Sequence, residues 1–166
     1  MANRAYLYFQ DNRERFDLNR NAVDYLDSRH SVPWAWMLFF GPQDLVLQPS
    51  GQGWDDIFLV TEWEKAQARF EKRIQPLLDY FKDRINWEQL QTFLLVLESR
   101  KEAFLVLDPY EMDHLENPVQ WQKILKVLAS QSETQLQFDK LSEFCGLGWS
   151  RNEDRFFLQV FGAWYD

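Results

Sequence analysis

The sequence contains few of the residues on which metal sites and disulfides depend. Its 166 residues include one cysteine, Cys145, and two histidines, His30 and His114. A single thiol excludes an internal disulfide and favours a reducing compartment. Glu111 and His114 stand one helical turn apart, but a zinc site needs three or four ligands. We therefore expect no metal and no other cofactor, and we expect a cytoplasmic location.

Glycine motifs that bind phosphate are also lacking. Gly51-Gln52-Gly53 has Asp56 where a dinucleotide fingerprint needs its third glycine, and no Gly-Lys-Ser/Thr triplet occurs. Gly146-Leu147-Gly148 follows a predicted helix, where glycine ends a helix rather than binding a cofactor. Because the chain is also poor in histidine and cysteine, we expect a protein without catalytic activity. A divergent enzyme is the least favoured interpretation.

No apolar run is long enough to cross a bilayer. The longest, Trp34 to Phe40, is seven residues long, whereas a spanning helix needs about 20. The run from Ala5 to Phe9 is shorter than the roughly 7–15 apolar residues at the centre of a signal peptide. We therefore expect neither a membrane protein nor a secreted one.

Basic residues are outnumbered and unevenly placed. The chain has 26 acids against 18 bases, which gives a net charge of -8. Residues 34–64 contain five acids and residues 103–118 contain four, and neither window contains a lysine or arginine. Nucleic-acid binding relies on clustered lysine and arginine. The charge therefore disfavours nucleic acid and favours a basic protein as the partner.

Aromatic residues are abundant, at 17% of the chain, with 8 tryptophans and 14 phenylalanines. In the two base-free windows several of them stand directly beside acids. Tryptophan and tyrosine dominate the energetics of protein interfaces, and acidic neighbours speed the encounter with a basic partner. The predicted partner-binding residues are Trp54, Asp55, Asp56, Glu62, Trp63, Tyr110, Glu111 and Asp113.

A structural interpretation of the same windows stays open, because most large aromatic residues are buried and most loop acids are merely solvated. Trp34 and Trp36, inside a continuous apolar run, are expected in the core. Trp54, which stands between a glycine and two aspartates, is the tryptophan expected to be exposed.

The pattern of apolar residues predicts a mixture of strands and helices. The expected strands are 5–9, 45–47, 57–60, 103–107 and 156–161. Residues 21–29 are expected to form a short helix, and the run 34–40 fits a buried strand or a buried helix. Strands at both ends of the chain with helices between them predict an α+β fold. We expect one domain, residues 1–166, with a mainly antiparallel sheet and helices packed on it.

Helix starts are marked by capping residues. Thr61 with Glu64, and Asn86 with Gln89, have the form of a capping box, and Asn117-Pro118 is typical of a first helical turn. Pro76 is expected to kink or divide the helix that contains it. A last helix is expected to carry Leu136, Leu141 and Phe144, and to end at Gly146.

The segment Met1-Ala2-Asn3-Arg4-Ala5-Tyr6-Leu7-Tyr8 resembles the start of a group of small uncharacterised bacterial proteins. In size, acidity and tryptophan content the chain looks like bacterial immunity proteins, which neutralise the toxins of polymorphic toxin systems. This resemblance implies a cytosolic protein that binds and blocks a cognate toxin domain, such as a basic nuclease. The alternative is a small-ligand or regulatory module whose aromatic residues line a pocket.

Overall fold

An antiparallel sheet forms the centre of the molecule. The computed structural model describes residues 4–13, 25–29, 31–51, 53, 55–109, 117–130 and 153–164. Within these residues the sheet has six strands in the order β3-β4-β5-β1-β2-β6, and every neighbouring pair is antiparallel. The strands are β1 (Arg4–Gln10), β2 (Tyr25–Arg29), β3 (Leu45–Pro49), β4 (Asp55–Glu62), β5 (Phe104–Asp108) and β6 (Ala163–Trp164).

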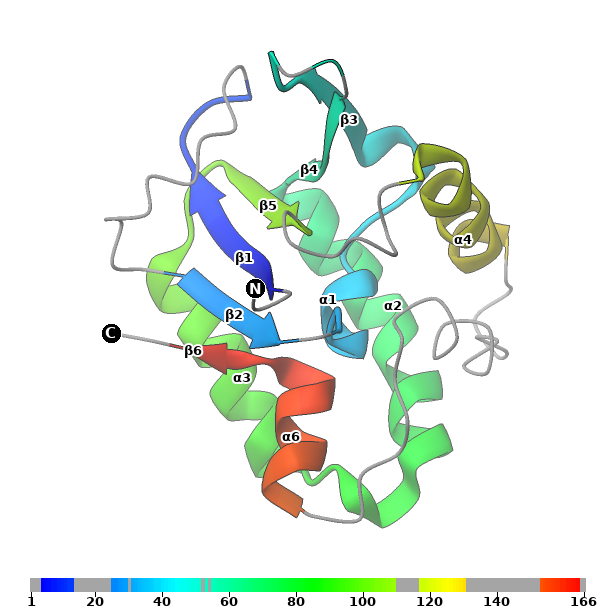
Figure 1. Cartoon of the computed structure of the whole chain (residues 1–166). Helices are drawn as coiled ribbons and strands as arrows, with labels where there is room; N and C mark the ends of the chain where they lie inside the picture. The colour runs from blue at the N-terminus through cyan, green and yellow to red at the C-terminus, as the bar shows by residue number, and fades with distance from the viewer. Residues whose placement is uncertain are drawn as a thin grey trace.

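Helices pack against one face of this sheet (Figure 1). Successive residues of a strand point to opposite faces of the sheet. On one face, Leu7, Leu59 and Leu107 pack with the helices in one large core cluster. The other face carries a smaller cluster that includes Tyr8 and Phe58. The helices are α1 (Trp34–Met37), the 3-10 turn η1 (Pro42–Asp44), α2 (Trp63–Phe81), the 3-10 turn η2 (Lys82–Arg84), α3 (Trp87–Arg100), α4 (Pro118–Ser130) and α6 (Glu153–Phe161). The predicted α+β class is confirmed.

The apolar run from Trp34 to Phe40 is the most deeply buried segment among the described residues. It forms α1 and the turn that follows, and each of its seven side chains is at most 1% exposed. Phe39 stacks on Phe70 of α2 with ring centroids 4.6 Å apart, and Trp34 stacks on Phe81 at 4.4 Å. A helix that is apolar on all sides must be surrounded by protein. The prediction that Trp34 and Trp36 are core residues is confirmed.

Two arginines of α2 bind the backbone carbonyls at the end of this run. Arg73 Nη1 donates to the carbonyl oxygens of Leu38 and Phe40, at 3.1 and 2.6 Å, and Arg69 Nη1 donates to that of Phe39 at 3.2 Å. The last carbonyls of a helix have no partner within the helix, and a buried carbonyl without a partner is costly. The arginines therefore allow an apolar segment with polar backbone groups to enter the core.

Asp44 is the counter-ion of Arg69 in this network. Its carboxylate accepts hydrogen bonds from Arg69 Nη1 at 2.5 Å and from the Gly41 amide at 2.7 Å, and the residue is 4% exposed. Burial raises the pKa of the Asp44 carboxyl, while the Gly41 amide and Arg69 act in the opposite direction. Burial also lowers the pKa of Arg73 to about 10, so this guanidinium stays charged at neutral pH. We call Asp44, Arg69 and Arg73 the arginine clamp.

The C-terminal end of α6 is held by the Trp36 side chain. Its indole Nε1 donates to the Phe161 carbonyl at 2.8 Å. Gly162 follows in the left-handed region, with φ of 78°. A Cβ at this position would overlap the Trp36 indole and lie 3.2 Å from the Asp27 carbonyl oxygen. Glycine is therefore required here by both backbone conformation and space.

Several predicted elements are confirmed. The strands expected at 5–9, 45–47, 57–60 and 103–107 correspond to β1, β3, β4 and β5. The Asn86 side chain accepts from the Gln89 amide at 2.8 Å and the Gln89 side chain accepts from the Asn86 amide, which makes the expected capping box at α3. The Asn117 side chain accepts from the Val119 amide at the start of α4.

Two predicted elements are wrong. Residues 25–29 form β2 instead of a helix, because they pair with β1 and place Leu26 in the core and Tyr25 on the other face of the sheet. Residues 156–161 belong to helix α6 instead of a strand. Phe156 and Val160, four residues apart, are both buried, which is a helical spacing that a short apolar run does not separate from a strand.

The start of α2 also differs from expectation. Thr61 lies in β4, where its hydroxyl accepts from Arg69 at 3.1 Å, and Glu62 at the N-cap position makes no side-chain capping bond. The Trp63 amide instead donates to the Ala103 carbonyl at 3.0 Å. The helix is not divided at Pro76 and continues to Phe81. The helix predicted around Leu136, Leu141 and Phe144 lies outside the described residues. The single-domain prediction for residues 1–166 likewise extends beyond the described ranges.

Loss of the acid in the arginine clamp should destabilise the protein strongly. In Asp44→Ala, Arg69 keeps its buried charge and loses its counter-ion, which costs about 3–5 kcal/mol. Lys65→Ala is the control, because it breaks the exposed Lys65–Glu62 pair, and such pairs contribute at most about 1 kcal/mol. Urea unfolding of both variants measures the difference. Equal stability of the two variants would contradict the role of the clamp.

The space at Gly162 can be separated from its backbone conformation. Gly162→Ala and Gly51→Ala both place alanine at a positive φ, but nothing lies within 4 Å of a Cβ at Gly51. Gly162→Ala should therefore lose about 1–3 kcal/mol more than Gly51→Ala, which is the cost of overpacking against Trp36. Thermal unfolding of the pair tests this. A loss of stability no larger than in Gly51→Ala would show that the Trp36 indole can move aside without cost.

Candidate functional site

The predicted partner-binding residues are spread over the fold. Asp55 and Asp56 begin β4, and Glu62 ends it, so that about 23 Å of extended strand separates them. Asp55 and Glu62 are exposed. Trp63 is 7% exposed, and its ring packs edge-on against Phe9 with centroids 5.1 Å apart. The other predicted residues, Trp54, Tyr110, Glu111 and Asp113, lie outside the described residues, as do His30, His114 and Cys145.

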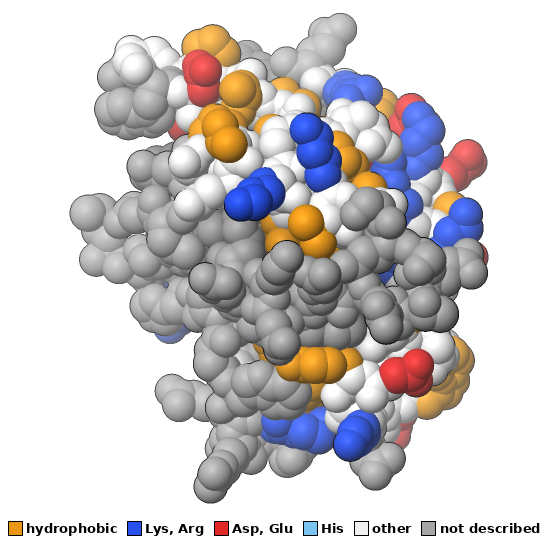
Figure 2. All heavy atoms as spheres, turned by 90° about the vertical axis from the view of Figure 1, so that its right-hand side faces the viewer, with side chains coloured by type: hydrophobic (Ala, Val, Ile, Leu, Met, Phe, Trp, Pro, Cys, Tyr) orange, Lys and Arg blue, Asp and Glu red, His pale blue; other side chains and the backbone are white. Residues whose placement is uncertain are grey.

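The acids of the base-free windows do not all contribute to the surface. Asp44 is buried in the arginine clamp, and Asp108 is 4% exposed at the end of β5. On the side of the molecule that carries α4, Figure 2 shows lysine and arginine side chains over the upper part and again near the lower end, while the acidic side chains form no continuous patch. Lys123 and Lys126 of α4 are exposed. The described part of that face is therefore not an acidic surface.

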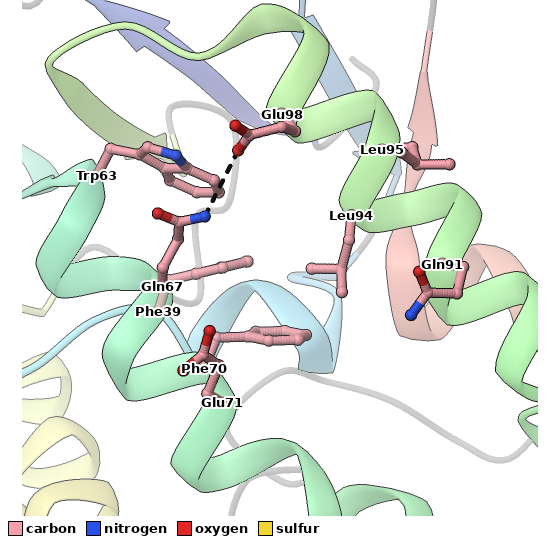
Figure 3. Close-up of a pocket in the computed structure, with 9 residues that line it drawn as sticks. All are labelled: Phe39, Trp63, Gln67, Phe70, Glu71, Gln91, Leu94, Leu95 and Glu98. Carbon is pink, nitrogen blue, oxygen red and sulfur yellow. Dashed lines mark hydrogen bonds between the residues drawn. The ribbon is translucent and has the colours of Figure 1, made fainter.

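A pocket of about 270 Å³ opens between α2 and α3 (Figure 3). Phe70 and Leu94 point toward each other across it, and Phe39 reaches it from the turn after α1. The pocket is thus mostly apolar, with charged and amide side chains at its edges. Its lining residues are Phe39, Trp63, Gln67, Phe70, Glu71, Gln91, Leu94, Leu95 and Glu98.

Helical periodicity explains why these residues meet. The α2 residues of the pocket follow Trp63 at intervals of four, seven and eight, and the α3 residues follow Gln91 at three, four and seven. These intervals place side chains on one face of a helix. The pocket lies where the two faces meet, and the Gln67 amide donates to the Glu98 carboxylate between the two helices at 3.5 Å.

The Glu98 carboxylate carries the charge at one end of the pocket. It forms an ion pair with Lys101, and this ammonium group holds the pKa of the Glu98 carboxyl below its usual value, with a smaller contribution from the Trp63 indole N–H. Glu98 is therefore ionised at neutral pH. The buried indole Nε1 lies near this carboxylate but completes no well-formed hydrogen bond with the described residues. Glu71, on the α2 side, has no ion-pair partner among the described residues and is exposed.

Two large apolar side chains are exposed on α3 next to the pocket. Leu95 is 66% exposed and is directed away from the cavity in Figure 3, and Trp87 is 67% exposed. Trp87 precedes Gln91 by four residues and Leu94 by seven, so it lies on the same face of the helix as the pocket. We call Trp87, Leu95 and the pocket the α3 face. Exposed aromatic residues beside a concave site are typical of binding surfaces.

Sequence reasoning selected Trp63 and Glu62 but missed the rest of this site. The buried side of α3 carries Leu90, Phe93 and Leu97, and Trp87 lies off that stripe at the first helical position. A large aromatic residue that does not follow the apolar period of its helix is the signal that was available. The pairing of α2 with α3 depends on tertiary packing, and no signal in the sequence gave it.

The described residues contain no cluster of three or more His, Cys, Asp or Glu side chains that could hold a metal ion. None of the described helices has both the length and the apolar character that a bilayer-spanning helix needs. No protein-family model, curated protein or solved structure matches the chain. Functional inference therefore depends on the geometry of the α3 face.

Tryptophans in the core and on the α3 face should respond differently to truncation. Trp63→Ala removes a buried ring and should cost about 3–5 kcal/mol of unfolding free energy. Trp87→Ala, at an exposed position, should change it by no more than about 0.5 kcal/mol. Urea unfolding monitored by circular dichroism measures both. A large loss in Trp87→Ala would show that this ring packs on the protein and is not available to a partner.

Proposed function

We propose that this chain is a cytoplasmic, non-catalytic protein of the immunity or antitoxin type, which binds and blocks a basic toxin domain through the α3 face. The main support is the exposed Trp87 on the same side of α3 as an acid-edged apolar pocket. Tryptophan contributes strongly to protein interfaces because it buries a large area with little loss of side-chain entropy. Two-thirds of this side chain is exposed in the free protein, so a partner would remove a large apolar area from water.

Charge favours a basic partner at this face. Glu71 and Glu98 line the pocket, and Glu62 directly precedes Trp63 in the sequence. The whole chain carries a net charge of -8, which attracts a basic partner from a distance and speeds encounter. Acids around an apolar centre also give the usual anatomy of an interface, in which a polar rim surrounds the contacts that contribute most of the affinity.

The proposed contact surface differs in part from the residues selected by sequence. Trp63 lines the pocket with a buried ring, and Glu62 is the residue before it in the chain. Asp55 and Asp56, at the other end of β4, are too distant to share one small contact with them. The proposed surface therefore consists of Trp87 and Leu95 with the pocket between α2 and α3.

A second candidate function is a small-ligand or regulatory module. The observation that favours it is the pocket itself, which has aromatic walls and a buried indole N–H that completes no well-formed hydrogen bond with the described residues. Its volume of about 270 Å³ lies just below the range for small-molecule sites, roughly 300–1,000 Å³. A ligand that fills it would raise the unfolding temperature further as the ligand concentration increases. A thermal-shift screen of small metabolites tests this candidate.

Partner capture tests the proposed function with a matched pair of variants. Trp87→Ala should weaken partner binding by about 2 kcal/mol or more, as truncation of a central interface residue does. Val119→Ala is the control, because Val119 is 72% exposed but lies on α4. The tagged wild-type chain and both variants are used to capture proteins from the native cell, with elution by increasing salt.

The expected result is a basic protein that binds wild-type chain and Val119→Ala, is released by salt, and is lost with Trp87→Ala. Equal retention by all three chains would exclude the α3 face as the contact surface. Retention of no basic protein by the wild-type chain would contradict the proposed function itself.

A further inference from the structure

We propose that the pocket between α2 and α3 is a recognition site for a lysine side chain, an inference that rests on the proposed binding of a basic protein. The pocket is open to solvent, and the exposed Trp87 lies one turn of α3 before Gln91 of its lining. A partner seated on the α3 face would therefore present side chains to the pocket. At about 270 Å³ it has room for one long side chain. The occupant is identified by the chemistry of the walls.

The walls fit the stem of lysine. Phe39, Phe70 and Leu94 supply an apolar interior, and the Phe39 and Phe70 rings are stacked with centroids 4.6 Å apart. A lysine side chain buries its methylene groups along apolar surface and keeps its ammonium group near water. An open pocket with an apolar interior and a polar edge matches that division.

The edges fit the ammonium group. Glu71 and Glu98 lie on different helices, and among the described residues no lysine or arginine lines the pocket. Lys101 neutralises Glu98 in part, whereas Glu71 has no such partner among the described residues. A compact ammonium group with three donors can contact acceptors on both walls. The planar fork of arginine instead favours the two oxygens of one carboxylate, so the arrangement favours lysine.

The buried indole of Trp63 supplies a further contact and a reporter. Its ring lines the pocket, and its Nε1 faces the Glu98 carboxylate without completing a well-formed hydrogen bond with the described residues. A buried donor of this kind gains a partner when an acceptor enters. A lysine residue brings its own backbone carbonyl as well as its side chain, so a peptide can satisfy both the donor and the acids.

An NMR titration with two small probes tests the proposal without the partner. The probes are Nα-acetyl-lysine N-methylamide and Nα-acetyl-norleucine N-methylamide, which have nearly the same stem and differ in the ammonium group. The lysine probe should shift the Trp63 indole signal, assigned with Trp63→Phe, in a saturable manner. The signal of Trp121, a buried tryptophan of α4, should not move. The norleucine probe should bind more weakly, by about two- to five-fold, the usual effect of one exposed ion pair.

A matched pair of charge variants locates the interaction. Glu71→Gln removes the pocket acid that has no ion-pair partner within the described part of the chain. It should weaken binding of the lysine probe by about two- to five-fold, without affecting binding of the norleucine probe. Glu88→Gln is the control, because Glu88 is an exposed acid in the first turn of α3 and does not line the pocket. Both residues are exposed, so both variants should keep the wild-type unfolding temperature.

Three outcomes would overturn the proposal: no saturable shift at Trp63, equal affinity for the two probes, or equal effects of Glu71→Gln and Glu88→Gln. The captured partner could depend on Trp87 while the lysine probe causes no saturable shift. This result would overturn the lysine site and leave the proposed function intact. Saturable, Glu71-dependent binding of the lysine probe without any captured partner would support the site and contradict the proposed function. Free amines would then be the source of the cation.

Discussion

The hydrogen bonds from Arg69 and Arg73 to the carbonyls of residues 38–40 are the constraint on which the rest of the structure depends. The segment they hold is apolar on every side, and its backbone carbonyls would otherwise be buried without partners. Asp44 supplies the opposite charge, and its own pKa is raised by burial, so the network is costly unless all of its members are present. The clamp therefore fixes where α2 lies on the core.

The position of α2 in turn determines the candidate site. The clamp arginines occupy one side of α2, and Phe70, the residue after Arg69, stacks on Phe39. Phe39 thus belongs both to the clamped segment and to the pocket lining. Phe93 of α3 also lies near these rings, with its centroid 6.1 Å from that of Phe70. A pocket whose walls are tied to a buried charge network is held in shape before a ligand arrives, which lowers the entropic cost of binding.

Local patterns in the sequence predicted the fold class and most strands, because alternation and capping act over a few residues. The capping box of Asn86 and Gln89 is such a case. The local spacing of apolar residues predicts the wrong element where tertiary contacts decide the structure. One such element is β2, which is a strand because it pairs with β1. The base-free window 34–64 predicts an acidic surface, yet its Asp44 is paired with Arg69, which lies outside the window. Charge in sequence is therefore a poor guide to charge at the surface when the counter-ion is distant along the chain.

The central claim is that a basic partner contacts the α3 face and enters the pocket beside it. Amide hydrogen exchange of the chain, measured with and without the captured basic protein, tests this claim most directly. If a basic partner contacts the α3 face, exchange should slow in residues 67–71 of α2 and 87–98 of α3, while β3 and the start of β4 keep the rates of the free protein. Protection confined to residues 45–56, with α3 unchanged, would contradict the claim.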